Sequence, residues 1–148
     1  ILSGLVGSEM CIRDSLKAIK PGIRVWGVET AGAHSMSQAL QAGRPVDIDV
    51  SSIVSTLGVP IIDELMFAHA RHYVEDMVVV PDEEAIKGML SFAQGARQWV
   101  ELASGALVPA VIATAPRLPA DAVIGLVVCG GNISLQDMTK WAAHAGIS

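Results

Sequence analysis

A β-branched run that ends at one cysteine and two glycines constrains the fold of this chain more than any other feature. The run is Val127-Val128-Cys129-Gly130-Gly131, and Ser134 with Asp137 predicts a capped helix directly behind it. A strand followed by a turn and a helix is typical of open α/β sheets, which bind ligands at the carboxyl ends of their strands. Taken alone, Cys129 is more simply a small apolar residue at a strand end, because free cysteine is among the most buried residue types.

The rest of the chain alternates between strand and helix patterns, which predicts an α/β fold, a three-layer sandwich with a mainly parallel sheet. Asp82 is expected to cap a long helix, and the three tryptophans, Trp26, Trp99 and Trp141, are expected in the core. We expect strands over 23–29, 77–80 and 122–129, and helices over 35–42, 51–57, 63–73, 83–98, 103–114 and 134–145.

Composition excludes several classes of protein. A net charge of −5 leaves no basic face for nucleic acid, and no apolar stretch approaches the roughly 20 residues of a membrane helix. Two cysteines argue against a disulfide framework or a cysteine-rich metal site, so a cytoplasmic location is the default expectation. A hydrophobic content of 51% with only 17% charged residues is what half of a larger core would show.

Four segments in order resemble one enzyme family. Residues 27–36 (GVETAGAHSM), 52–59 (SIVSTLGV), 100–106 (VELASGA) and 127–135 (VVCGGNISL) are similar to segments of the pyridoxal-phosphate L-serine and L-threonine dehydratases, which have the tryptophan-synthase-β-like fold, fold type II. Leu102 stands where this family usually has proline. The cysteine in the last segment is closer to dehydratases than to racemases, which usually carry serine. The resemblance covers the chain from about Ile19 onward and corresponds to the C-terminal half of such an enzyme.

The resemblance implies a site for the pyridoxal ring. Cys129 would donate a hydrogen bond to the ring nitrogen, Gly130 and Gly131 would let the backbone approach the ring, and Glu101 would lie near it. Pyridoxal phosphate is an electron sink that the protein orients and tunes. An ordinary strand-to-helix turn is the alternative for the two glycines, and a plain helix start is the alternative for Glu101.

The resemblance also implies a monovalent, potassium-like cation, because carbonyl-rich oxygen ligands suit a weakly charged ion. A divalent ion would require further carboxylates, and this sequence has Ala33 and Ser35 at the positions concerned. The implied ligands are Glu29, Ala33, Ser35, Leu57 and Val59.

Glu29 and the histidines have other interpretations. A strand-end acid can bind ribose hydroxyls in dinucleotide-binding folds, but the required G-x-G-x-x-G turn is missing; a solvated glutamate is the plain alternative. His34 is expected to shape its loop or a subunit contact. His69 and His72 are expected to form a half-exposed polar stripe rather than a metal site.

Residues 1–15 resemble a translated sequencing adapter and are treated as a non-native leader, so that residues 16–148 are the C-terminal part of the enzyme's large domain. The parent enzyme would convert L-serine or L-threonine, a small amino-acid substrate, to a 2-oxo acid and ammonia as a homodimer. None of the lysines named here, Lys17, Lys20, Lys87 and Lys140, is taken to match the family's Schiff-base lysine. That lysine is therefore expected elsewhere, and this chain alone is expected to be inactive. A serine racemase, a β-replacing synthase and a noncatalytic scaffold remain alternatives.

Overall fold

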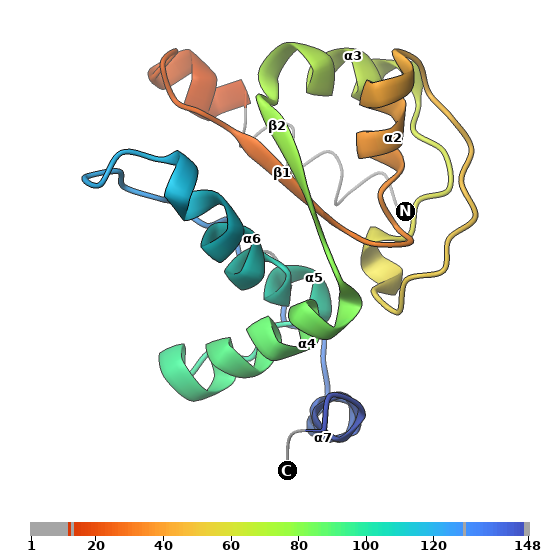
Figure 1. Ribbon diagram of the computed structural model, residues 1–148, viewed down its shortest axis with the longest axis vertical. Coiled ribbons are helices and arrows are strands. Elements are labelled where there is room, and N and C mark those ends of the chain that lie inside the picture. Colours follow the sequence, from red (N-terminus) through yellow and green to blue (C-terminus); the bar gives the residue numbers. More distant parts are fainter. Residues whose placement is uncertain (1–11, 13, 129, 147–148) are drawn as a thin grey trace.

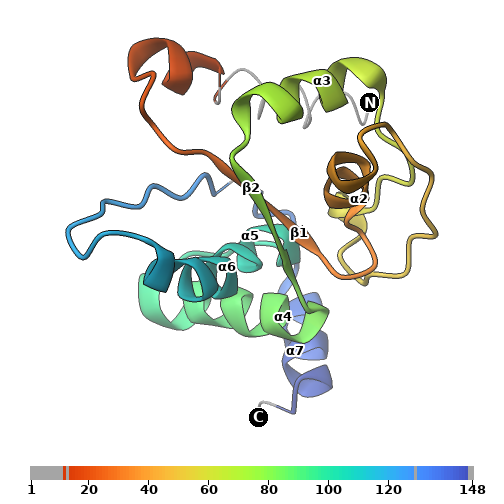
Figure 2. The ribbon, with the colours of Figure 1, turned by 45° about the horizontal axis from the view of Figure 1, so that its top comes forward.

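Two parallel strands lie between two groups of helices (Figure 1). This computed structural model describes residue 12, residues 14–128 and residues 130–146. The strands are β1 (Trp26–Thr30) and β2 (Asp76–Val80), and their parallel pairing confirms the predicted α/β class. On one side of them lie α2 (Ser35–Ala42) and α3 (Glu64–Tyr73), and on the other lie α4 (Asp82–Ser91), α5 (Leu102–Gly105) and α6 (Leu107–Thr114), as Figure 2 shows from a second direction.

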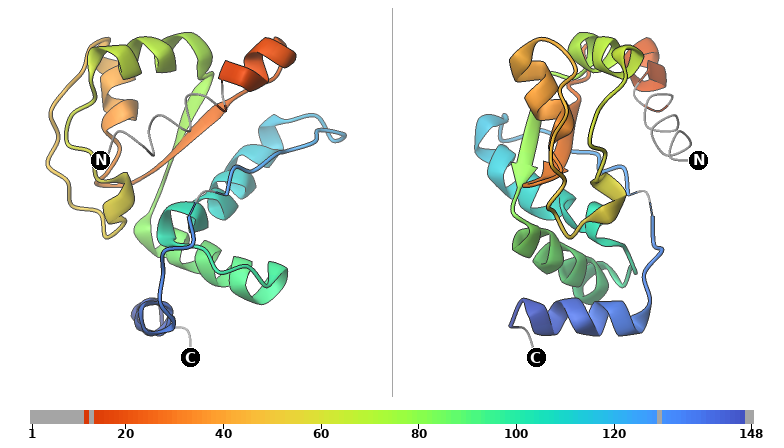
Figure 3. Two further views of the ribbon diagram at one scale, coloured as in Figure 1. Left: turned by 180° about the vertical axis from the view of Figure 1, so that it is seen from behind. Right: turned by 90° about the vertical axis from the view of Figure 1, so that its right-hand side faces the viewer.

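The connection between the strands brings both of their carboxyl ends to one edge. Parallel strands require a crossover, and here it carries α2, the short helix η1 (Ser55–Leu57) and α3. The register places Thr30 opposite Val80, so the segments that follow the two strands leave the sheet side by side. Both views in Figure 3 show η1 close to these carboxyl ends.

Several helix ends follow directly from local sequence. Asp63 caps α3 by accepting a hydrogen bond from the Met66 amide at 2.8 Å. Gly43 ends α2 in the left-handed conformation, with a φ of 70°. Ser134 and Asp137 form the predicted capping box at the start of α7 (Leu135–His144). The end of α2 and the capping box of α7 confirm predictions from the sequence, whereas the cap at Asp63 is a finding of the structure, because the predicted helix begins at Asp63 itself.

Two predicted long helices are interrupted. The helix expected over 83–98 ends as α4 at Ser91 and continues as a π-helical turn, η2 (Phe92–Ala96), before Arg97 turns away with a φ of 57°. The helix expected over 103–114 breaks at Ala106 into α5 and α6. Pro109 explains the second break, because it has no N–H to offer the carbonyl of Gly105 one turn earlier.

The helix predicted over 51–57 is wrong except for its last turn, η1. The segment before η1 instead binds other parts of the fold: Ser51 and Ser52 donate to the Gly32 carbonyl at 2.9 and 3.4 Å, and Ile53 donates to the Asp82 carboxylate at 2.9 Å. Because its carboxylate binds this loop, Asp82 does not cap α4. It is the first residue of that helix, and Pro81 is the N-cap.

The third predicted strand is not formed in the part of 122–129 that the structure describes. Residues 122–128 have no regular secondary structure and are all exposed, with Val123 98% exposed. A strand needs a neighbour to receive its backbone hydrogen bonds, and the strands described here pair only with each other.

The main core lies between β2 and helices α4 to α7. Ile86 and Met89 of α4 are fully buried there. Gly88 of α4 and Gly105 of α5 face each other without side chains, because a Cβ on Gly88 would collide with the Gly105 carbonyl oxygen. The absence of a Cβ at each position thus sets how closely α4 and α5 pack.

The prediction that the tryptophans are core residues is wrong in part. Trp99 is 50% exposed, and Trp141 is half-buried. Trp26 is also half-buried, with the guanidinium groups of Arg24 and Arg117 at 5.1 and 4.6 Å from its ring. An indole ring attracts cations to its face, which explains how Trp26 is covered without a fully apolar environment.

Candidate functional site

The Glu29 carboxylate is buried at the end of β1 and binds the start of α2. It is 8% exposed. One oxygen accepts a hydrogen bond from the Met36 amide at 2.9 Å, and the other accepts from the Ser37 amide at 2.9 Å and the Ser37 hydroxyl at 2.6 Å. The interpretation of Glu29 as a solvated strand-end residue is therefore wrong. A negative charge is stabilised at this position because the free amides of a helix N-terminus point toward it.

A second loop is anchored to the same strand ends. Gly32, just after β1, has a φ of 82° and its missing Cβ would lie 2.8 Å from the Ser52 amide nitrogen, so a side chain cannot be accommodated there. Its carbonyl accepts the Ser51 and Ser52 amides. The turn after β1 and the loop that leads to η1 are consequently in direct contact.

The five residues implied as cation ligands lie in two stretches of the chain, one from the end of β1 to the start of α2 and the other at the end of η1. Ala33 and Ser35 are buried beside Glu29, at 0% and 3% exposure. Leu57 ends η1, and its carbonyl accepts the Val59 amide at 2.9 Å. The oxygen atoms of these five residues are suitable ligands for a monovalent cation. The Glu29 oxygen that accepts the Met36 amide has one further lone pair, and carbonyl oxygens would supply the other ligands. Binding of a cation by these residues stays a prediction.

His34 lies directly before α2, and His69 and His72 lie on α3. His34 shapes its loop by accepting a hydrogen bond from the Gly32 amide at 3.2 Å. His69 is half-buried and His72 is exposed. Both contact the Tyr73 ring, at centroid distances of 6.0 and 4.4 Å. Among the residues described, no group of three or more histidine, cysteine, aspartate or glutamate residues is placed to hold a metal ion.

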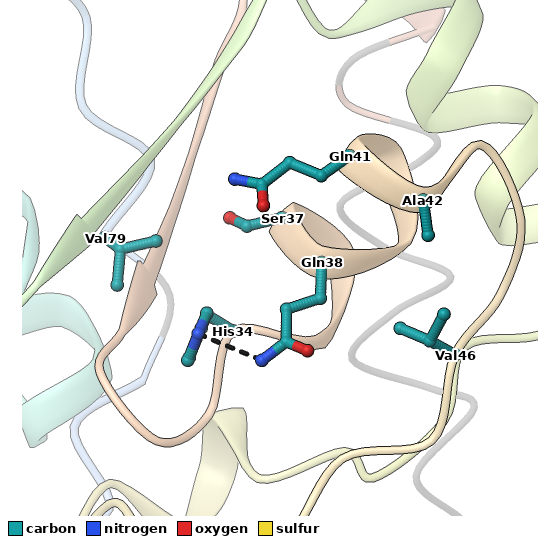
Figure 4. A pocket seen from close by; sticks show the side chains of 7 residues that line it. All are labelled: His34, Ser37, Gln38, Gln41, Ala42, Val46 and Val79. Atoms are coloured by element: carbon teal, nitrogen blue, oxygen red, sulfur yellow. Dashed lines mark hydrogen bonds between the residues drawn. The ribbon is translucent and has the colours of Figure 1, made fainter.

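A pocket of about 510 Å³ lies beside α2 (Figure 4). A hydrogen bond of 3.1 Å joins Gln38 to His34 on one wall, and Ser37, which binds Glu29, lies on another. Val79 of β2 faces it from the strand. The pocket adjoins the Glu29 end of the site, and Glu101, Gly130 and Gly131 are not among the described residues that line it. The full lining is His34, Ser37, Gln38, Gln41, Ala42, Val46 and Val79.

The glycines predicted to bind the ring are packed against the start of α5. Gly130 has a φ of 113°, and a Cβ there would collide with the Glu101 carboxylate. The Gly130 carbonyl accepts the Glu101 amide at 3.2 Å and the Ser104 hydroxyl at 3.4 Å. A Cβ on Gly131 would lie 2.8 Å from the Trp99 carbonyl oxygen. Gly130, Gly131 and Glu101 thus lie close together, whereas Cys129 lies outside the described residues. Binding of the ring by these residues stays a prediction.

Burial raises the pKa of the Glu101 carboxyl above its ordinary value, because a partly apolar environment disfavours the charged form. A side-chain-free turn beside a partly buried carboxyl fits a flat heteroaromatic ring. A Cβ at Gly131 would collide with the Trp99 backbone, and a Cβ at Gly130 would be strained by its positive φ and would displace the Glu101 carboxylate.

Three contributors to the site were missed from sequence: Ser37, Ser52 and Asp82. Ser37 binds Glu29, and Ser52 and Asp82 hold the second loop. Ser37 stands in the first turn of a predicted helix behind a strand-end acid, which is a usable signal. No local pattern shows that Asp82 binds a loop 30 residues earlier.

Comparison with known proteins decides the family. The family model described as pyridoxal-phosphate dependent enzyme matches residues 12–130. The chain belongs to the pyridoxal-phosphate dependent enzyme family. Within this family it is 34% identical over 136 residues to the serine dehydratase-like protein of Mus musculus, covering 85% of this chain and 41% of that protein. It is 30% identical over 118 residues to the catabolic L-serine/threonine dehydratase of Saccharomyces cerevisiae, covering 74% of this chain and 33% of the relative.

Solved structures of pyridoxal-phosphate enzymes have the same fold. The structure of maize serine racemase superimposes with a TM-score of 0.78 over 93% of this chain and 44% of that chain, at 24% identity. This likeness confirms the expected fold. The chain spans less than half the length of the relatives that it matches. No helix in the described ranges is long and apolar enough to cross a bilayer.

Proposed function

We propose that residues 16–148 are the C-terminal part of the large domain of a pyridoxal-phosphate lyase that converts L-serine or L-threonine to a 2-oxo acid and ammonia. The observation that carries the proposal is the docking of the Gly130–Gly131 turn on Glu101 and Ser104. This docking joins two segments that are about 30 residues apart in sequence. Both segments contain residues that the resemblance implies for binding the ring. The identity of 34% to a serine dehydratase-like protein supports the same reaction.

Each residue of the site has a proposed role. Cys129 would donate a hydrogen bond to the ring nitrogen, and Gly130 and Gly131 would let the backbone approach the ring. Glu101 contacts the turn and would lie near the ring with a carboxyl whose pKa burial raises. When bound, pyridoxal phosphate withdraws electrons from the α-carbon of an amino acid, so that loss of the α-proton leads to loss of the β-hydroxyl. A neutral thiol suits this elimination, because it leaves the ring nitrogen unprotonated.

A cation site at the end of β1 is the second part of the proposal. Glu29, Ala33, Ser35, Leu57 and Val59 would bind a potassium-like ion with carboxylate, hydroxyl and carbonyl oxygens. This places the ion at the carboxyl end of β1, the edge of the sheet where open α/β proteins bind their ligands. Removal of the ion would loosen both loops, because it would be their common ligand.

The proposal also covers the rest of the enzyme. A lysine in a Ser-x-Lys setting and a phosphate-binding glycine loop would come from sequence upstream of residue 16, so this chain by itself would have no dehydratase activity. The intact enzyme would be a cytoplasmic homodimer. Light scattering of the intact enzyme would measure its subunit number.

The test begins with a long read of the source DNA across the junction before Leu16. Upstream codons for a glycine loop and a Ser-x-Lys strand would support the proposal. The intact protein is then supplied with L-serine and L-threonine, and 2-oxo acid and ammonia are measured in equal amounts. Formation of the D-amino acid as the main product would favour the racemase instead. A complete gene without the lysine would overturn the catalytic proposal and favour a noncatalytic scaffold.

A further inference from the structure

Three hydrogen-bonded side chains join the carboxyl ends of both strands to the loop before η1. Thr30, the last residue of β1, is fully buried, and its hydroxyl lies 2.8 Å from the Ser52 hydroxyl. Ser52 donates in turn to the Asp82 carboxylate at 2.6 Å. Thr30 and Ser52 are 22 residues apart, and Ser52 and Asp82 are 30 apart. We refer to Thr30, Ser52 and Asp82 as the strand-end relay.

The direction of each hydrogen bond in the relay follows from the chemistry of its groups. An ionised carboxylate only accepts, and a hydroxyl has one proton to donate and two lone pairs. Ser52 therefore uses its proton on Asp82. One of its lone pairs accepts the Val54 amide at 3.0 Å, and the other is left for Thr30, which must donate. Every hydrogen-bonding position of Ser52 is occupied, so this hydroxyl has one orientation.

The relay holds the loop that leads to Leu57 and Val59, two of the five proposed cation ligands. The other Asp82 oxygen accepts the Ile53 amide at 2.9 Å, which anchors the loop at a second point. Leu57 and Val59 follow within a few residues, whereas Ala33 and Ser35 stand on the turn directly after Thr30. Thr30 thus lies close in sequence to Ala33 and Ser35. Through its hydrogen bond to Ser52 it also contacts the loop that leads to Leu57 and Val59.

We propose that Ser52 is a positioning residue for cation binding, and that Thr30 and Asp82 fix its orientation. The proposal rests on the cation site of the proposed function. Carbonyl oxygens bind a monovalent ion well only when several of them are already at the correct separation. The residues that hold these carbonyls in place therefore affect the affinity for the ion. Loss of such supporting hydrogen bonds typically weakens metal binding about 10-fold to 100-fold.

The experiment measures thermal unfolding of the 148-residue chain as potassium chloride replaces tetramethylammonium chloride at constant ionic strength. A ligand that binds only the folded state raises the unfolding temperature with a dependence set by its dissociation constant. The variants are Ser52→Ala, which removes the hydroxyl, and Ser52→Thr, which keeps it. Ser91→Ala is the matched control, because the Ser91 hydroxyl is exposed and bonds only within α4, to the Lys87 carbonyl.

In the unsubstituted chain and in Ser91→Ala, potassium is expected to raise the unfolding temperature with the same midpoint concentration. Ser52→Ala is expected to move that midpoint about 10-fold or more upward, and Ser52→Thr to restore it. Ser52→Ala could unfold at a lower temperature at every potassium concentration and still keep the original midpoint concentration. That result would overturn the positioning role of Ser52 but not the cation site. An unsubstituted chain that does not respond to potassium would overturn both.

Discussion

The contact between Gly88 and Gly105 offers a sharp test of the packing of α4 on α5. A Cβ added to Gly105 would collide with the Ala85 carbonyl oxygen and lie 2.7 Å from the Met89 amide nitrogen and 2.9 Å from the Met89 Cβ. Two of these three neighbours are backbone atoms of α4, which cannot move without shifting the helix. Gly105→Ala is therefore expected to force the two helices apart.

The magnitude follows from two opposing effects. Overpacking a core costs about 1–3 kcal/mol, and collision with backbone places Gly105→Ala at the upper end of that range. Alanine in a helix is about 1 kcal/mol more favourable than glycine, so the free energy of unfolding is expected to decrease by about 2 kcal/mol in total. For a chain of 148 residues this corresponds to a decrease in unfolding temperature of about 4–8 °C.

Circular dichroism at 222 nm during heating measures the effect. Gly95→Ala is the matched control, because an added Cβ at Gly95 meets nothing within 4 Å and its φ is not in the left-handed region; it is expected to keep or raise the unfolding temperature. Gly88→Ala should resemble Gly105→Ala, and the double variant should lose less than the sum, because both report one contact. A Gly105→Ala chain as stable as the control would refute the reasoning.

Three further predictions concern the site and the last helix. Glu29→Gln should destabilise the fold by about 2–3 kcal/mol in urea unfolding, because the new amide group would face the N–H donors of α2. Burial raises the pKa of Glu101, so its ionisation should lower stability as pH rises from the ordinary carboxyl value of 4.5; Glu101→Gln should remove this part of the pH dependence. Ser134→Ala should cost about 1 kcal/mol through the lost N-cap, and faster amide exchange in the first turn of α7 would measure it.

Each of these has a contradicting result. A Glu29→Gln chain with an unchanged urea midpoint would show that the buried carboxylate does not stabilise α2. Stability profiles of Glu101→Gln and the unsubstituted chain that coincide from pH 4 to 7 would refute the effect of burial on Glu101. Unaltered exchange in Ser134→Ala would show that contacts with α4, rather than the cap, hold the start of α7. Thr139→Ala, on an exposed face of the same helix, is its control.

Predictions from sequence were most accurate where the deciding contact lies within about four residues. The end of α2 at Gly43 and the capping box at Ser134 both depend on such local hydrogen bonds. The roles that the family resemblance implies for Gly130 and Glu101 stay predictions, although the Gly130 carbonyl accepts the Glu101 amide. Assignments from pattern alone failed at 122–128, where a β-branched run has no paired neighbour among the residues described.

The sequence by itself determined the alternation of strand and helix, the family and the helix caps, because these depend on side-chain chemistry and short-range backbone bonds. Only the tertiary structure showed that Asp82 binds the loop at Ser52 instead of capping α4, and that Glu29 is buried against α2. The physical reason is the parallel crossover, which brings the carboxyl ends of β1 and β2 to one edge of the sheet. Acceptors there bind whichever donors the fold delivers, and donors from 8 to 30 residues away replace those that lie next in the chain.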